Sequence, residues 1–403
     1  MIATSMKVHP TFEVMKIYRT VFAAGFRPFF TSCALYAVVL MTAWIGVFTF
    51  GWEMAGSQPR NWHAHEMIHG VVAAAIAGFL LTAVPKWTGT RQVQGTMLLS
   101  LWLLWLIGRV GFWLADTGAD GVGGKVAQVL DLTFLPALSI AVSWPILKTG
   151  NRRNLLIAAV LAALFAANLI QGFDAFSHLA NILALDLVMI LMVIIGGRIG
   201  PAFTRNWLAR RGLKADAVQM HGWLDITALG LVIALTVAAL LESPSGAVGI
   251  IALVAALANM ARLVEWQGWR AWRDPLVWVL HLGYAWIVIS LFLRGITGLV
   301  PALPPNAWVH ALGVGAVGTL ILGVMARATL GHTGRELRLP IGGGTMFALV
   351  TVAAVARTGN AIGWFDHNIS LSVAGFAWII AFAVFGLLFF PKLLRPRVDG
   401  QPD

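Results

Sequence analysis

The stretch FSHLANILALDLVMILMVIIGG, residues 176–197, decides the fold class because almost every side chain in it is apolar. It contains one acidic residue, Asp186, and neither lysine nor arginine. An α-helix needs about 20 such residues to cross the hydrocarbon core of a bilayer. We therefore interpret this stretch as a transmembrane helix.

The composition of the whole chain agrees with a membrane protein. Hydrophobic residues make up 59% of the 403 residues and charged residues 11%, whereas soluble domains carry about 25% charged residues. This balance excludes soluble enzymes and nucleic-acid-binding modules, so we expect membrane lipid and no nucleic acid as a partner, despite the net charge of +11. Cys33 is the one cysteine, which excludes intramolecular disulfides and thiolate clusters.

Working outward from residues 176–197, we find twelve apolar runs that are long enough to span a membrane. The connections between them are short, so we predict an all-α polytopic membrane protein with one integral-membrane domain, residues 1–403, and no cleavable signal peptide. The twelve predicted helices cover residues 28–50, 63–85, 96–115, 126–147, 154–172, 176–197, 218–241, 245–264, 275–296, 306–329, 342–363 and 368–390.

The distribution of lysine and arginine gives the predicted orientation. Alternate loops, starting with the N-terminal segment, carry 23 of the 28 basic residues. By the positive-inside rule these loops are cytoplasmic, so the segments 1–27 and 391–403 are both predicted to lie in the cytoplasm. The opposite, predicted outer side holds Arg60, Lys125, Arg294 and Arg357, while Arg109 falls inside a helix.

A weak internal repeat connects the second and tenth predicted helices. A shift of 245 residues places His65 on His310, and it also places Gly70 on Gly315 and Gly78 on Gly323. The sixth predicted helix ends in a comparable way, which suggests three units of four helices. Chance matches among the 42 glycines are the alternative explanation.

Histidines gather at the predicted outer end of the second helix. His63, His65 and His69 lie within seven residues, together with Glu66 and Met67. Imidazole is the commonest metal ligand, and a methionine sulfur suits Cu(I). The cluster therefore indicates a metal or cofactor site, although a single histidine in a membrane helix more often makes an interhelical hydrogen bond.

Several longer strings resemble the NnrS family, and they occur in order from residue 25 to residue 335. The strings are GFRPFF (25–30), WHAHEM (62–67), GFLLTAVPKWTG (78–89), GGRIGPAFTRN (196–206), LHLGYAW (280–286) and GVMARATLGHTGR (323–335). The resemblance implies a bacterial inner-membrane protein that contains haem and copper and takes part in nitric oxide metabolism or nitrosative-stress defence.

Residues that match the family strings are candidates for holding these cofactors. The resemblance implies metal ligands at His63, His65, His281, His310 and His332, whereas His69 lies outside the strings. By depth, the first two and His310 could form an outer centre, and the other two could form an inner one. The family usually has Asn where this chain has Lys86, which leaves the role of that position open. Five arginines in the strings could pair with haem propionates: Arg27, Arg198, Arg205, Arg327 and Arg335.

Charged residues inside the predicted helices form a separate group. Arg109 could pair with Asp131 or Asp186, and Asp225 lies in the seventh helix. Such residues either form static ion pairs or pass protons, and the sequence leaves both interpretations open.

Three functions are compatible with these observations. The first is a haem- and copper-binding protein that reacts with nitric oxide, with electrons from a quinol or a redox protein. The second is a distant relative of the twelve-helix haem–copper oxidases and nitric oxide reductases, although the chain lacks their His-Pro-Glu-Val-Tyr string. The third is a secondary transporter without haem. Whether the protein is an enzyme stays open, since a sensor of nitric oxide without turnover fits as well.

Overall fold

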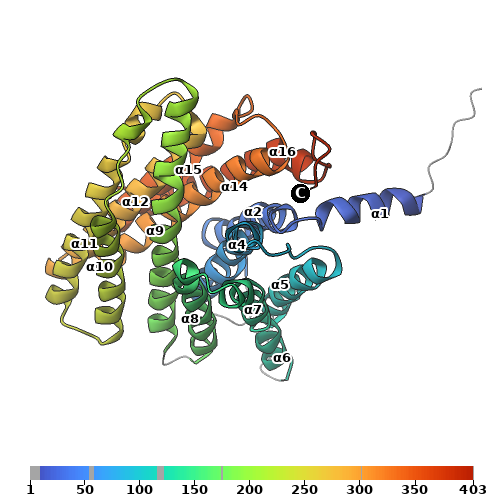
Figure 1. Cartoon of the computed structure of the whole chain (residues 1–403). Helices are drawn as coiled ribbons and strands as arrows, with labels where there is room; N and C mark the ends of the chain where they lie inside the picture. Colours follow the sequence, from blue (N-terminus) through green and yellow to red (C-terminus); the bar gives the residue numbers. More distant parts are fainter. Residues whose placement is uncertain (1–9, 54–58, 116–121, 174–175, 301, 403) are drawn as a thin grey trace, which may run out of the picture.

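The computed structural model describes residues 10–53, 59–115, 122–173, 176–300 and 302–402, and every regular element within these ranges is a helix (Figure 1). The first half of the chain forms α1 (Pro10–Val21), α2 (Phe26–Phe50), α3 (Pro59–His65), the π-helix η1 (Glu66–Val72), α4 (Ala73–Thr88), α5 (Gly95–Ala115), α6 (Val122–Asp131), α7 (Phe134–Lys148), η2 (Arg152–Asn154), α8 (Leu155–Gln171) and α9 (Ser177–Arg210). The second half forms η4 (Ala215–Ala217), α10 (Gly222–Leu240), α11 (Ser245–Glu265), η5 (Gly268–Ala271), α12 (Pro275–Leu299), α13 (Ala307–His310), the π-helix η6 (Ala311–Gly318), α14 (Thr319–His332), α15 (Gly343–Ala361) and α16 (His367–Leu393).

Eleven helical segments of the described chain are long and apolar enough to cross a membrane. They coincide with eleven of the twelve predicted helices, so the prediction of an all-helical, multi-pass membrane protein is confirmed. The remaining prediction, residues 342–363, forms α15, which packs against α16 and η6. Arg357, Asn360 and several threonines make α15 less apolar than the other spans, and it is not among the eleven.

Two predicted helices differ in detail from the observed ones. The predicted helix 126–147 is divided into α6 and α7 after Asp131, where Thr133 turns its hydroxyl to the carbonyl oxygen of Leu130. The predicted helix 176–197 continues past Pro201 to Arg210 and ends just before Gly212, which has a positive φ of 66°.

The start of the first span and the end of the last span lie together. The buried Arg27, at the beginning of α2, donates hydrogen bonds to the carbonyl oxygens of Leu393 and Arg395, at 2.7 and 2.8 Å. This arrangement agrees with an even number of crossings when α15 is counted, whereas the cytoplasmic location of both termini stays a prediction. In Figure 1, α1 projects away from the bundle.

The structure reproduces the internal repeat seen in the sequence. The two helices that the shift of 245 residues aligns both change into a π-helix directly after the aligned histidine, His65 or His310. A glycine in the left-handed conformation follows both helices: Gly89 caps α4, and Gly334 lies two residues after the end of α14. π-helical segments are rare and frequently mark functional sites, so their recurrence at aligned positions supports a true repeat.

Packing around the two π-helices is also repeated. α2 packs against η1 and α4 in the same way as α12 packs against η6 and α14, and the neighbours α5 and α15 correspond as well. Two glycines permit these close approaches: a methyl group on Gly78 would lie 2.6 Å from the Phe30 ring, and one on Gly323 would lie 2.9 Å from Val279. α9 packs against helices of both units, between α8, α10, α12 and η6.

Candidate functional site

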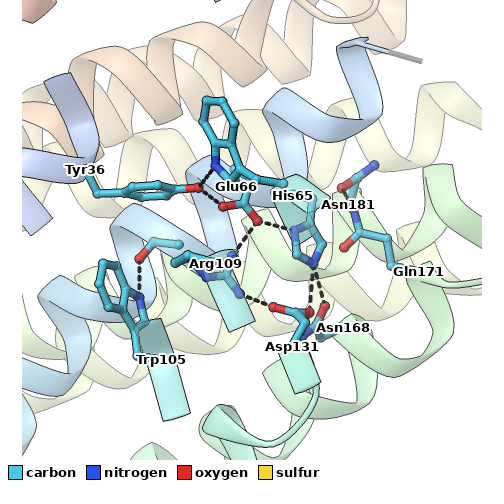
Figure 2. A network of polar contacts seen from close by, with 11 residues as sticks. Tyr36, His65, Glu66, Trp105, Arg109, Asp131, Asn168, Gln171 and Asn181 are labelled. Atoms are coloured by element: carbon cyan, nitrogen blue, oxygen red, sulfur yellow. Dashed lines mark hydrogen bonds and ion pairs between the residues drawn. The ribbon is translucent and has the colours of Figure 1, made fainter. Parts of the chain in front are cut away.

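A cluster of four charged side chains is buried where α3, η1, α5 and α6 meet. We call His65, Glu66, Arg109 and Asp131 the buried ion cluster; none is more than 4% exposed. Arg109 donates to one oxygen of Glu66 and to Asp131 Oδ1. Figure 2 shows the four side chains pointing toward one another, with Tyr36 and Asn168 at the edges.

Both nitrogens of His65 face acceptors in this cluster. Nδ1 lies 2.9 Å from Glu66 Oε1, and Nε2 lies 3.1 Å from Asp131 Oδ2 and 3.1 Å from Asn168 Oδ1. The ring also stacks on Phe112, with 3.9 Å between centroids and 7° between planes. His65 is therefore fixed on both edges and on one face.

The hydrogen-bond pattern assigns the charges in the cluster. Glu66 accepts from Arg109 and from the Tyr36 hydroxyl, and Asp131 accepts from Arg109 and from the Asn168 amide. Both nitrogens of His65 face these acceptors, and we assign it as an imidazolium because that form donates to both ionised carboxylates. Two cations then balance two anions, which a low-dielectric environment requires.

The buried ion cluster connects five helices of the bundle. Its members and their two neutral partners come from α2, the junction of α3 and η1, α5, α6 and α8. Trp113 supports the edge by donating to the Tyr36 hydroxyl at 2.8 Å. The predicted pairing of Arg109 with Asp131 is thus confirmed, and Glu66 is the additional partner. Tyr36 and Asn168 were not predicted; a lone polar residue in an apolar helix was their one signal.

Two further histidines, His63 and His310, lie at the predicted outer end of the bundle, near this cluster. We call His63, on α3, and His310, the last residue of α13, the outer histidine pair. The His63 ring stacks on Trp44, with 4.0 Å between centroids, and its buried Nδ1 has no hydrogen-bond partner. A neutral imidazole nitrogen without a partner is available to a metal ion.

The other two candidate ligands of this helix have different surroundings. His69 is buried beside His65, with 4.9 Å between ring centroids, and its Nε2 has no partner. Met67 is half-buried and packs against the apolar core. The histidines predicted to form one outer centre are therefore divided: among the described residues no carboxylate pairs with His63 or His310, whereas His65 contacts Glu66 and Asp131.

His281 lies on α12 and contacts α9 and η5. The Thr204 hydroxyl donates to the carbonyl oxygen of Gly200, at 2.9 Å. Because its hydrogen is used there, the Thr204 oxygen accepts from His281 Nε2, at 2.7 Å. Nδ1 then carries the lone pair, and it has no partner. A methyl group on Gly268 would lie 2.3–2.6 Å from three atoms of the ring, so the backbone of η5 packs closely against the His281 imidazole.

His332 lies at the opposite end from the outer histidine pair and contacts other elements than His281 does. Its Nδ1 is 2.9 Å from the Lys86 ammonium group, and its ring packs on Phe26. Lys86, the departure from the family pattern, thus interacts directly with a histidine implied by the resemblance. A cation that donates to Nδ1 competes with a metal ion for the same lone pair.

Four of the five candidate arginines already have structural partners. Arg27 binds the end of α16, Arg198 donates to Asn154 and to the carbonyl of Arg153, and Arg205 donates to the carbonyl of Val218. Arg335 donates weakly to the Thr333 carbonyl; burial, with Arg27 and Arg395 nearby, lowers its pKa.

Arg327 differs from the other four arginines in its contacts. Its guanidinium group lies over the Phe203 ring, 3.9 Å from the centroid, and the side chain is buried. A cation–π contact satisfies the charge but leaves the planar fork of N–H groups available for a carboxylate. Of the five, Arg327 therefore fits an anionic group best.

The remaining buried charges form static pairs elsewhere in the bundle. Arg294 donates to Asp186 at 2.5 Å, between α12 and α9, and Arg262 donates to Asp225 at 2.7 Å and to the Tyr284 hydroxyl at 2.6 Å. Asp186 is therefore the partner of Arg294 and not of Arg109. Both arginines connect α12 to its neighbours.

An apolar cavity of about 100 Å³ lies between α4, α9 and α14. Its lining comes from α2, η1, α4, α9, η6 and α14 and includes Phe30, Phe79, Met192, Ile199 and Met325. No histidine lines it. Among the described residues, no group of three or more histidine, cysteine, aspartate or glutamate side chains is arranged to hold a metal ion.

Comparison with known proteins agrees with the resemblance. The family described as NnrS protein matches residues 20–397, which is nearly the whole chain. No curated protein is similar enough to be counted as a relative.

Proposed function

Since the chain belongs to the NnrS family, we propose that it is a haem- and copper-binding protein of the bacterial inner membrane that reacts with nitric oxide. The family is linked to the nitric oxide response, and the helices long enough to cross a membrane support the location. Nitric oxide is a small neutral molecule that enters apolar surroundings readily, so a reaction inside the bundle needs no polar channel.

The unpartnered imidazole nitrogen of His63 carries the proposal. Buried polar atoms are almost always hydrogen-bonded, so a buried nitrogen without a partner is the expected state of a ligand position. We propose that the outer histidine pair holds copper. Two protein ligands leave positions open for a further ligand, as in catalytic metal sites. Trp44 would orient the His63 ring by stacking, because it fixes the plane in which Nδ1 lies.

The apolar cavity does not by itself fit a second cofactor, a haem: its volume of about 100 Å³ is smaller than a porphyrin, and its lining holds no histidine, although Met325 and Met192 contribute polarizable sulfurs there. The haem of the proposal therefore rests on membership of the family. Arg327, two residues after Met325, would pair with a propionate. A haem iron or a copper ion with an open position supplies a binding site for nitric oxide and an electron. Electrons for turnover would come from a quinol or a separate redox protein.

The residues around the outer histidine pair have distinct tasks in this proposal. The buried ion cluster, two residues further along the same helix, fixes the start of η1 and so fixes where His63 points. The chain's part in the reaction is therefore to position two neutral imidazoles and to exclude water from them.

An anaerobic absorption spectrum of the detergent-purified protein, oxidised and dithionite-reduced, tests the proposal together with metal analysis. We expect a Soret band that shifts when nitric oxide is added, and copper in the same sample. His63→Ala and His310→Ala should each lose copper, while His221→Ala should keep it, because His221 is exposed and pairs with Glu265.

Two outcomes would contradict specific parts of the proposal. Wild-type copper content in both histidine variants would remove the copper from the outer histidine pair. The absence of haem and copper after expression with both supplied would remove the cofactors altogether. A secondary transporter would then become the better interpretation.

A further inference from the structure

The first helix of the chain, α1, presents an apolar face that is largely exposed. Four residues of this face are spaced i, i+3, i+4 and i+7, which places them on one side of an α-helix: Val14, Ile17, Tyr18 and Val21. Val14 is 67% exposed and Ile17 is 53% exposed. Figure 1 shows α1 projecting away from the bundle. An exposed group of large apolar side chains marks a surface that binds a partner.

The other face of α1 is charged. Lys16 and Arg19 lie on the side of the helix away from Val14, and both side chains are exposed. The helix also contains one acidic residue, Glu13. A helix with an apolar face and a polar face that carries lysine and arginine is typical of helices that lie in the plane of a membrane interface.

The last turn of α1 lies at the level where two membrane spans begin. The carbonyl oxygen of Phe22, directly after α1, accepts from the backbone N–H of Gly95, the first residue of α5, at 2.8 Å. The Phe22 ring contacts Tyr18 on α1 and Trp102 on α5, with 5.4 and 6.0 Å between centroids. Both α2 and α5 are long and apolar enough to cross a membrane. α1 is therefore attached to the bundle at the predicted inner boundary of the membrane.

Lipid is the partner that fits both faces of this helix. The exposed apolar side chains of α5, the span to which α1 is attached, already require lipid around them: Met97, Leu103, Ile107 and Val110. The inner leaflet of a membrane also carries anionic headgroups that attract basic residues close to its surface. The apolar face of α1 thus suits the acyl chains, and Lys16 and Arg19 suit the headgroups.

We propose that α1 lies in the lipid interface on the predicted inner side of the membrane. Its apolar face enters the boundary between headgroups and acyl chains, and its basic face points toward anionic headgroups and water. Through Phe22, the bound helix fixes the depth at which α2 and α5 enter the bilayer. This inference goes beyond the proposed function, and it holds with or without haem and copper.

Nitroxide labels on the two faces of α1 test the inference in the full chain. Val14→Cys and Lys16→Cys are a matched pair, because the two positions are close in sequence but nearly opposite on the helix. The native Cys33 is buried, and the wild type treated with the same label gives the background. Power-saturation EPR in vesicles of phosphatidylethanolamine and phosphatidylglycerol measures collisions with oxygen, which concentrates in lipid, and with a nickel chelate, which stays in water. We expect the label at position 14 to collide mainly with oxygen and the label at position 16 mainly with the nickel chelate.

Two results would overturn the proposal. Equal access of the nickel chelate to both labels would place α1 in water. Protection of the label at position 14 from both reagents would show that protein, such as a second copy of the chain, covers the apolar face. Adding Lys16→Glu and Arg19→Glu to Val14→Cys should increase collisions with the nickel chelate, and an unchanged value would refute the role of the anionic headgroups. None of these readouts depends on the cofactors, so the inference and the proposed function can fail separately.

Discussion

Replacing Asp131 by asparagine tests the buried ion cluster most directly. The side chain is 3% exposed and accepts from Arg109, His65 and Asn168. Asparagine has nearly the same size, so the change removes a charge without opening a cavity. The cluster then holds two cations and one anion, and the uncompensated charge cannot reach water.

The expected cost follows from what is left unpaired. Removing one partner of a buried ion pair destabilises a protein by about 3–5 kcal/mol, because the other charge stays buried. We expect Asp131→Asn to fall in this range, measured as the free energy of unfolding in SDS–detergent mixed micelles. Asp399→Asn is the matched control: the same chemical change at the exposed pair with Arg397 should have no measurable effect.

A double variant separates charge balance from the loss of individual hydrogen bonds. Arg109→Gln with Asp131→Asn leaves one cation, His65, and one anion, Glu66, so neutrality returns. We expect the double variant to be more stable than the sum of the single changes predicts, with a coupling energy of about 1–3 kcal/mol. Strictly additive effects, or a loss below about 1 kcal/mol in Asp131→Asn, would refute the assigned charges.

Three further predictions concern packing and the two ends of the bundle. Gly70→Ala should lower the free energy of unfolding by about 1–3 kcal/mol, because the added methyl group would lie 2.5 Å from the Tyr36 ring. Gly313→Ala should be tolerated, because a methyl group there would meet nothing within 4 Å. Arg27→Gln should lower the free energy of unfolding by about 1.5–3 kcal/mol for each hydrogen bond lost to the end of α16. Thermal denaturation measures this loss, with Arg27→Lys as the control. Lys86→Asn and His332→Ala should keep the copper content of the wild type, because both lie away from the outer histidine pair; metal loss in either would move the copper to the opposite end.

The membrane-spanning helices could be predicted from the sequence because lipid imposes a simple rule. Every backbone polar group must be satisfied within the helix, so an uninterrupted apolar run such as residues 176–197 has one possible structure. The rule fails where side chains compete. The predicted helix 126–147 is interrupted after Asp131, whose carboxylate forms an ion pair with Arg109 on α5.

The candidate site was predictable only in part, for a related reason. The histidine run at residues 63–69 marked the helix end at which the buried ion cluster lies, but sequence spacing assumes 3.6 residues per turn. The π-helix η1 begins directly after His65 and changes which later side chains share a face. Spacing along one helix also could not show that His65 faces Asp131 of α6 while His63 stacks on Trp44 of α2.

The two repeats explain why one histidine is bound by charges and the other is open. Their backbones are equivalent, since each passes from an α-helix into a π-helix at the aligned histidine. The difference therefore comes from single side chains: Glu66 follows His65, whereas Ala311 follows His310. Glu66 accepts from Arg109 and lies 2.9 Å from His65, whereas the alanine side chain of Ala311 offers His310 no acceptor. For this reason we propose the copper at the outer histidine pair and assign a structural role to the buried ion cluster.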